Sequence, residues 1–224
     1  VRCGDSGQRR RRERPHRMPV YLGHDVLELN YNRVGAFEER LRRKFVLLSS
    51  KTGRRIADEQ APAPAASRPF TWTAFGRDEI TAMRTFLDAR RGRAVPFWLP
   101  SFQWDLALAE DVSQNQSSAT IWWVRYKQQM WGTTGARRHL AIWSLGDGTM
   151  DYCRITGAID VANYQTETLT LDPVAQREYT RTKTVLSFLK FCRLDEDRIE
   201  ISYPSPQVAE ATIRVRELPL EAPL

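Results

Sequence analysis

The chain has 224 residues, of which 42% are apolar and 27% are charged, and its formal net charge is +7. This composition excludes a disordered chain, and the length allows one large domain or two small ones with a real core. The positive charge gathers at one end, because residues 1–17 hold seven arginines and two acids. The 27 bases and 25 acids that remain give the body a net charge of only +2, so the total charge is weak support for nucleic-acid binding.

Cysteine usage and hydropathy exclude further classes. Cys3, Cys153 and Cys192 are widely spaced, which fits neither a disulfide framework nor a zinc or iron–sulfur site. We therefore expect no metal and no cofactor. No apolar run approaches the roughly 18–20 residues needed to cross a bilayer, and no apolar segment follows the basic N-terminus. We expect a soluble protein with no membrane insertion.

Residues 1–17 are predicted to form a basic disordered arm, because four consecutive arginines repel one another and nothing apolar is available to bury. The sequence changes character at Met18. Two hypotheses follow: the biological start is Met18, or the arm binds nucleic acid or an acidic partner.

From Met18 the pattern is mainly β. Short apolar segments at 26–31 and 45–48 and the aromatic, β-branched segment 70–75 are typical of strands. Residues 60–67, with two prolines, are predicted to form a long exposed loop or arm, because proline cannot continue a hydrogen-bonded ladder.

An amphipathic helix is predicted over residues 77–91. Acids occupy its first turn, and Arg90 and Arg91 occupy its last, which complements the helix dipole. We expect these two arginines to be solvated, with ligand binding as the alternative. Gly92 supplies the C-terminal stop. The apolar residues that fall on one face are Ile80, Met83, Phe86 and Leu87.

The segment after the helix, residues 93–106, is stiff and aromatic. Pro96 and Pro100 hold the backbone extended. Its large side chains either pack the helix against a sheet or face a neighbouring subunit. The interface candidates are Phe97, Trp98, Leu99, Phe102 and Trp104, together with Arg90 and Arg91.

Tryptophan is concentrated between residues 98 and 143, which hold six of the seven. Such a cluster suits a carbohydrate platform, a base-stacking surface, or the core and subunit interface of a β fold. The core and interface interpretation is favoured, because Trp122 and Trp123 lie in a strand-like run at 119–126. The glycan-facing candidates are Trp122, Trp123 and Trp131.

Residues 107–183 are predicted to form a small inserted β domain. Turn signals lie at 132–135 and 146–148, and the spacing of short strands favours a small barrel or sandwich. The expected strands are 119–126, 138–145, 152–157 and 168–171.

The C-terminal part returns to longer strands. Residues 184–194 are nearly all apolar, which predicts a strand covered on both faces, and residues 198–203 and 209–216 alternate between apolar and polar. We expect a three-stranded antiparallel meander that pairs with the N-terminal strands. The division is then a β-rich domain of 18–106 with 184–219, plus the insertion at 107–183.

Chemistry-bearing motifs are weak. His16, His24 and His139 show no metal-ligand spacing. Ser187 and Lys190 match the S-x-x-K pattern of acyl-enzymes, but a strand places them on opposite faces. The acids 195–197 fit a hairpin turn better than a calcium loop. We find no nucleotide-binding motif and expect no catalytic residue, so the chain is predicted not to be an enzyme.

Several segments resemble a known family. The helix that runs into ARRGRAVPFWLPS (89–101) resembles the distal tail and baseplate hub proteins of long-tailed, siphovirus-like bacteriophages and gene transfer agents. Residues 151–173, with an Arg-Ile strand, a Thr-Leu-Thr-Leu strand and an Asp-Pro exit, are similar to the family's insert. Residues 194–203 resemble its closing strand, and residues 216–219 resemble its end.

The resemblance implies a mainly β (α+β) fold: an antiparallel sandwich or barrel with one packed helix and a small inserted barrel-like domain. It implies a structural virion protein of the tail tip, assembled in the host cytoplasm, whose ring connects the tail tube protein to the baseplate hub and receptor-binding apparatus. Such rings are usually hexameric, and DNA would pass through the lumen without specific binding.

Alternatives remain open at this point. Related hub proteins are trimers, and some carry a four-cysteine iron–sulfur site that three scattered cysteines cannot reproduce, which favours the distal tail protein or a cluster-free hub. A glycan-binding module of the tail tip is a second hypothesis. A peptidoglycan hydrolase is a third, for which the sequence offers no residues.

Overall fold

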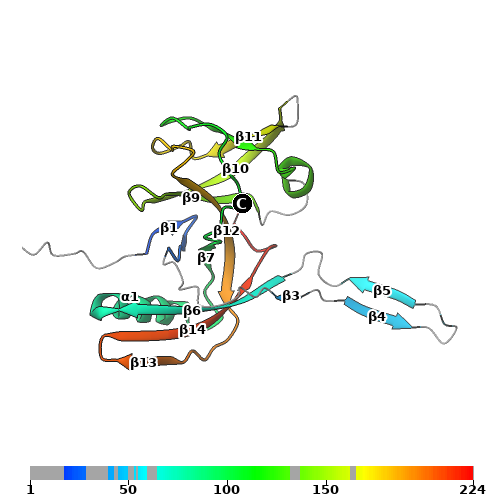
Figure 1. Ribbon diagram of the computed structural model, residues 1–224. Coiled ribbons are helices and arrows are strands. Elements are labelled where there is room, and N and C mark those ends of the chain that lie inside the picture. The colour runs from blue at the N-terminus through cyan, green and yellow to red at the C-terminus, as the bar shows by residue number, and fades with distance from the viewer. Residues whose placement is uncertain are drawn as a thin grey trace, which may run out of the picture.

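The chain folds into a mainly β structure with antiparallel sheets, which confirms the predicted α+β class (Figure 1). The computed structural model describes residues 18–28, 40–42, 45–49, 53, 55–59, 65–131, 137–161 and 165–223. The predicted arm at 1–17 and turn at 132–135 lie outside the described residues.

One half of the molecule is built on two long paired strands. β6 (Ala65–Phe75) and β14 (Val208–Glu217) are antiparallel over nine residue pairs, from Val208 with Phe75 to Arg216 with Ser67. The helix α1 (Gly76–Arg90) follows β6 directly and lies along this sheet (Figure 1). β3 (Arg40–Arg42) pairs with β6, and β13 (Ile201–Ser205) pairs with β14, while β7 (Phe97–Pro100) joins the same sheet through β12.

The other half holds the region that the sequence assigned to an insertion. β9 pairs with β10, β10 with β11, and β11 with β8, all antiparallel. A π-helical turn, η1 (Lys127–Trp131), follows β8. The strand bounds are β8 (Ser118–Trp122), β9 (His139–Ser144), β10 (Met150–Asp160) and β11 (Thr166–Asp172).

β12 (Thr184–Leu194) joins the two halves. Its first part pairs with β9, and its second part pairs with β7 and then with β14. Residues 184–189 are all buried, because β12 is covered on both faces as its apolar sequence predicts.

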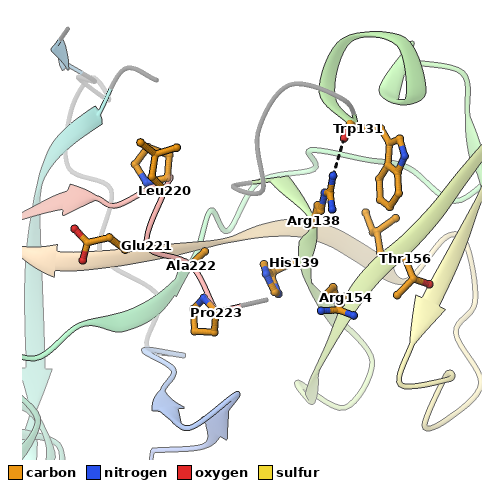
Figure 2. Close-up of a pocket in the computed structure, with 11 residues that line it drawn as sticks. Trp131, Arg138, His139, Arg154, Thr156, Leu220, Glu221, Ala222 and Pro223 are labelled. Carbon is orange, nitrogen blue, oxygen red and sulfur yellow. Dashed lines mark hydrogen bonds between the residues drawn. The ribbon is translucent and has the colours of Figure 1, made fainter. Parts of the chain in front are cut away.

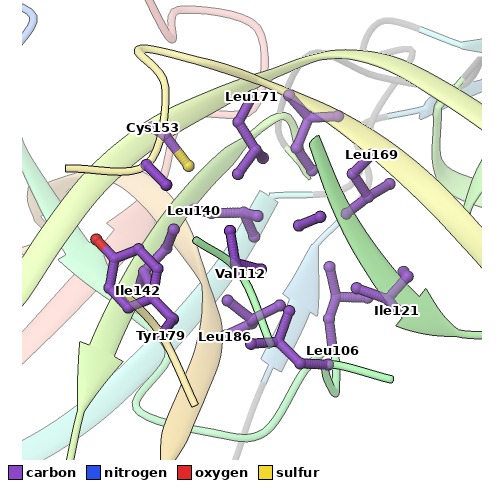
Figure 3. Close-up of a cluster of buried hydrophobic side chains, with 14 of the residues drawn as sticks. Leu106, Val112, Ile121, Leu140, Ile142, Cys153, Leu169, Leu171, Tyr179 and Leu186 are labelled. Atoms are coloured by element: carbon purple, nitrogen blue, oxygen red, sulfur yellow. The ribbon is translucent and has the colours of Figure 1, made fainter. Parts of the chain in front are cut away.

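The core divides into clusters along this strand. One cluster draws its residues from 106–188 (Figure 3), and a second draws them from 27–102 and 192–215. Leu106 forms a backbone bridge with Leu186 on β12, and Leu108 forms one with Ile121 on β8. The segment that precedes β8 is therefore held against two of the strands that contribute to the first cluster. The domain division itself stays a prediction, because β12 contributes side chains to both clusters.

Two short hairpins complete the described elements. β1 (Val20–Tyr21) pairs with β2 (His24–Asp25), and β4 (Phe45–Ser49) pairs with β5 (Arg55–Glu59). Among the described residues the β4–β5 hairpin pairs with no other strand, and it extends away from the rest of the molecule in Figure 1.

Most predicted elements are confirmed with shifted ends. The helix, the strand at 45–48, all four strands of 107–183 and the strand at 184–194 are present. The hairpin signal at 146–148 is also confirmed, since Gly148 has φ +70° between β9 and β10. In β14 the apolar positions are buried and the alternating polar ones face outward: Ala209, Ala211, Ile213 and Val215 are buried.

Three expectations are wrong. A strand is expected at 26–31, but Val26 forms only an isolated bridge with Trp98. Val26 and the adjacent Leu27 are buried in two different side-chain clusters, so this segment does not alternate between a buried and an exposed face as a half-buried strand does. Residues 29–31 lie outside the described part. Residues 65–67, expected in a loop, begin β6. They follow Pro62 and Pro64 in the sequence and are not prolines themselves, so their backbone N–H groups are able to join the hydrogen bonds of the sheet. The C-terminal meander is also wrong: β12 and β13 both pair with β14, on the edge opposite β6, and no β12–β13 pairing occurs among the described residues.

Candidate functional site

The aromatic strand that the sequence singles out lies inside the protein. Phe97 and Trp98 are fully buried, and Leu99 and Phe102 are nearly so. The Trp98 indole Nε1 donates to the Tyr21 carbonyl over 2.9 Å, and Phe97 packs edge-on against Phe86 of α1. Phe97, Leu99 and Phe102 share a cluster with the buried residues of α1, so they pack the helix against the sheet, whereas Trp98 packs with Tyr21, His139 and Phe191. Trp104, with 56% of its surface exposed, is available to a neighbour.

Arg90 corrects the expectation of a solvated end to the helix. Its side chain is 3% exposed, pairs with the Asp25 carboxylate and donates to the Pro96 carbonyl over 3.2 Å. Its guanidinium also lies 4.7 Å from the Phe86 ring centroid. The physical reason is that α1 turns its last residue toward the β1–β2 hairpin, where Asp25 supplies the compensating charge. Arg90 is therefore a buried cation that joins these elements, and not the solvated helix-end charge that was expected.

The end of α1 is built for an abrupt turn. Arg91 caps the helix with φ +49°, and Gly92 follows with φ +62°. A Cβ at Gly92 would lie 2.5 Å from Asp197 Oδ1. That carboxylate accepts the backbone N–H and the guanidinium of Arg93, so the turn is tied to the loop after β12. Arg91 is exposed and remains an interface candidate.

The three glycan-facing candidates lie in different surroundings. Trp122 is 51% exposed on β8. Trp123 is half-buried, with the Arg125 guanidinium 5.0 Å from its ring centroid. Trp131 is half-buried on η1, with Arg138 4.6 Å from its ring centroid. Trp122 is the most exposed of the three and the other two are half-buried, so the structure does not present them as one open platform.

His139 is a buried core histidine. Tyr21 Oη hydrogen-bonds its Nδ1 over 3.0 Å, and the Pro223 carbonyl accepts a hydrogen bond from the ring. Burial and the nearby Arg154 lower the pKa of His139 to about 4, so the ring is neutral at pH 7. His24 packs edge-on against Phe191, and His16 lies outside the described residues.

The weak catalytic motifs have structural explanations. The Ser187 hydroxyl donates to the Gln103 carbonyl over 2.7 Å, and Lys190 forms an ion pair with Glu217. The acids 195–197 each engage a side chain: Asp195 accepts from Ser67, Glu196 pairs with Arg214, and Asp197 pairs with Arg93. Within the described part of the chain, no three His, Cys, Asp or Glu side chains are placed to hold a metal ion.

Cys153 and Cys192 are buried free thiols, as expected of small apolar groups. Burial raises the pKa of Cys153 to about 12 and that of Cys192 further, which keeps both thiols protonated. Cys3 lies outside the described residues.

Three features were not found from the sequence. The carboxylate of Glu167 is fully buried and accepts backbone N–H groups of Val124, Tyr126 and Lys127, which holds the entry to η1. The β4–β5 hairpin exposes apolar side chains. A pocket of about 420 Å³ lies between η1, β9 and β10 on one side and residues 219–223 on the other (Figure 2). The partners of Glu167 and the two walls of the pocket are distant in sequence, so no local signal marks them; for the hairpin the sequence predicts the strand at 45–48 but not the exposure of its side chains.

Comparison with models of known protein families gives no match, and no curated protein matches the chain. Among the described residues, no helix is long and apolar enough to cross a membrane.

Proposed function

We propose that the chain is a structural subunit of a phage-type tail tip, a distal tail protein that assembles into a homo-oligomeric ring between the tail tube and the baseplate hub. The proposal begins from the resemblance of residues 89–101, 151–173 and 194–203. These segments occupy the end of α1 with β7, the β10–β11 pair, and the turn that leads from β12 into β13. All three segments form helices, strands or turns of the fold. This is what we expect of a protein that acts through contacts with its neighbours.

The β4–β5 hairpin is the observation that carries the proposal. Val46, Leu47 and Leu48 are consecutive on β4 and are 38%, 54% and 55% exposed. Successive side chains of a strand point to opposite faces, so both faces of the hairpin present large apolar groups to solvent. A two-stranded hairpin is marginally stable alone, and exposed apolar patches mark protein interaction sites. A neighbouring subunit that covers the hairpin would satisfy both requirements.

A ring also needs two different surfaces on each subunit, since a cyclic contact joins unlike patches. The hairpin supplies one surface. The main body supplies other exposed groups for the second, including Trp104 and Arg91, which remain from the sequence-derived candidates.

The experiment measures the mass of the full chain by light scattering, for the unaltered protein and for Leu47→Glu. We expect a discrete oligomer that Leu47→Glu converts to smaller species, because a charge would be buried in the contact. The matched control is Ile159→Glu, which alters a residue 61% exposed on β10 and should leave the mass unchanged. A hexamer supports the distal tail protein, and a trimer supports the hub alternative. An unaltered mass for Leu47→Glu contradicts the role of the hairpin.

A glycan-binding module stays the second proposal, and the exposure of Trp122 is the observation that favours it. Trp122→Ala should then abolish changes in tryptophan fluorescence on addition of bacterial surface polysaccharides. Fluorescence that no polysaccharide alters would exclude this function.

A further inference from the structure

The pocket of about 420 Å³ is walled on one side by cations (Figure 2). Arg138 and Arg154 both line it, and neither has a carboxylate within ion-pair distance among the described residues. The one acid at the pocket, Glu221, is engaged by Arg193 over 2.5 Å. The pocket therefore holds two guanidinium groups that form no ion pair with a described residue; the nearest cross-strand acid is Asp172, opposite Arg154 in the β10–β11 pair.

The arginine side chains differ in how they are held. Arg138 Nη2 donates to the Trp131 carbonyl over 3.3 Å, and its guanidinium lies over the Trp131 ring, while its buried Nε has no hydrogen-bond partner among the described residues. Arg154 makes no hydrogen bond or ion pair with any described residue and is half-buried at the pocket wall. Arg154 thus offers its donors to a ligand without giving up a hydrogen bond or ion pair to any residue that the structure describes.

The rest of the lining is mostly apolar. Trp131, Ile155, Pro219 and Leu220 contribute hydrocarbon surface, and Thr156 contributes a hydroxyl. The volume lies within the range of small-molecule sites, roughly 300–1,000 Å³, in which an apolar lining carries a few polar groups that fix orientation. Guanidinium groups bind carboxylates through paired N–H donors.

The opposite wall is formed by the C-terminal segment and is anchored at several points. Leu218 N–H donates to the Phe191 carbonyl over 2.8 Å, Glu221 pairs with Arg193, and the Pro223 carbonyl accepts from His139. The pocket is therefore bounded by fixed backbone on both sides, as a pre-formed binding site requires.

We propose that this pocket binds a small organic anion, a carboxylate on a ring of about six atoms, with the carboxylate at Arg138 and Arg154 and the ring against Trp131 and Leu220. The ring comes from either an aromatic acid or a sugar acid, and both present the same charge and similar size. The site is independent of ring assembly, because it uses none of the hairpin residues.

Isothermal titration calorimetry of the full chain tests the proposal with two matched pairs, benzoate against benzamide and glucuronate against glucose. We expect one of the anions to bind about tenfold or more tightly than its neutral partner, since hydrogen bonds to a charged group contribute that much. Binding of benzoate assigns an aromatic acid, and binding of glucuronate assigns a sugar acid.

Arg154→Gln should weaken binding of that anion by about tenfold or more with an unchanged circular dichroism spectrum. Arg198→Gln, which alters an arginine 87% exposed beside Glu200 and away from this pocket, is the control and should bind as the unaltered protein does. Equal binding of acid and neutral partner, no binding of either acid, or undiminished binding by Arg154→Gln would each overturn the proposal. Binding confined to an oligoglutamate peptide would also overturn it, in favour of an acidic protein partner.

Discussion

At the scale of single residues, a few side chains and one glycine hold the elements together. Arg90 joins α1 to the β1–β2 hairpin through Asp25, which lies 65 residues earlier in the chain. Gly92 and Arg93 join the end of α1 to Asp197. Each of these contacts links segments that are distant in sequence, so each can be tested by one substitution.

Gly92→Ala should destabilise the protein by about 1–2 kcal/mol, because alanine is strained at positive φ. The new Cβ would also meet Asp197 Oδ1 and disturb its contacts with Arg93. Chemical denaturation measures the change. Gly148→Ala is a useful comparison, since Gly148 has φ +70° but open space around it, so it should show the backbone effect alone. Equal stability of Gly92→Ala and the unaltered chain would contradict this role.

His139 should make stability depend on pH. Its pKa is about 4 in the folded protein against 6.5 ordinarily, so below pH 6.5 the unfolded chain binds more protons than the folded one. The stabilisation is fully present above pH 6.5 and is lost as pH falls from 6.5 through 4. Thermal unfolding at pH 7 and 4.5 should show a smaller decrease for His139→Gln than for the unaltered protein. A decrease of the same size in both would show that other groups are responsible.

At the scale of elements, the η1 turn depends on one buried carboxylate. Glu167 on β11 accepts the N–H groups of Val124, Tyr126 and Lys127, which no strand or helix partner satisfies in their place. The turn in turn places Trp131 beside Arg138 at the pocket.

Glu167→Gln should destabilise the protein by about 1–3 kcal/mol, because the amide has one acceptor oxygen and turns a donor toward backbone donors. Hydrogen exchange at residues 124–127 should accelerate most. Glu178→Gln, at an exposed position of the same half of the molecule, is the control and should change neither quantity. Exchange at 124–127 that stays as slow as in the unaltered chain would contradict the assignment.

The elements that sequence patterns predict well are those whose burial repeats regularly. Alternation over 209–216 predicts β14, and the apolar face of 77–91 predicts α1, since both patterns arise from local geometry. The pairing of β14 with β6 and β12, the burial of Arg90 and the capture of backbone N–H groups by Glu167 depend on residues far away in the chain. Local patterns carry no information on such contacts, which explains why the candidate interface strand proved to be core.

At the scale of the whole molecule, the protein combines a tightly packed body with an exposed hairpin. β12 runs through both halves and contributes side chains to each of the core clusters, so the two halves are packed together along that strand. The β4–β5 hairpin, in contrast, forms a separate two-stranded sheet in the described part of the chain and exposes Leu47 and Leu48. This contrast is what we expect of a subunit whose neighbours complete its structure.

The most direct test of the central proposal is a cryo-electron microscopy density map of the particles into which the chain assembles. We predict a closed ring of identical copies at the distal end of the tail, coaxial with the tube, with each β4–β5 hairpin packed against the next subunit. Absence of the chain from the tail tip, or a tail-tip position in which the hairpins remain in solvent and no ring closes, would contradict the proposal.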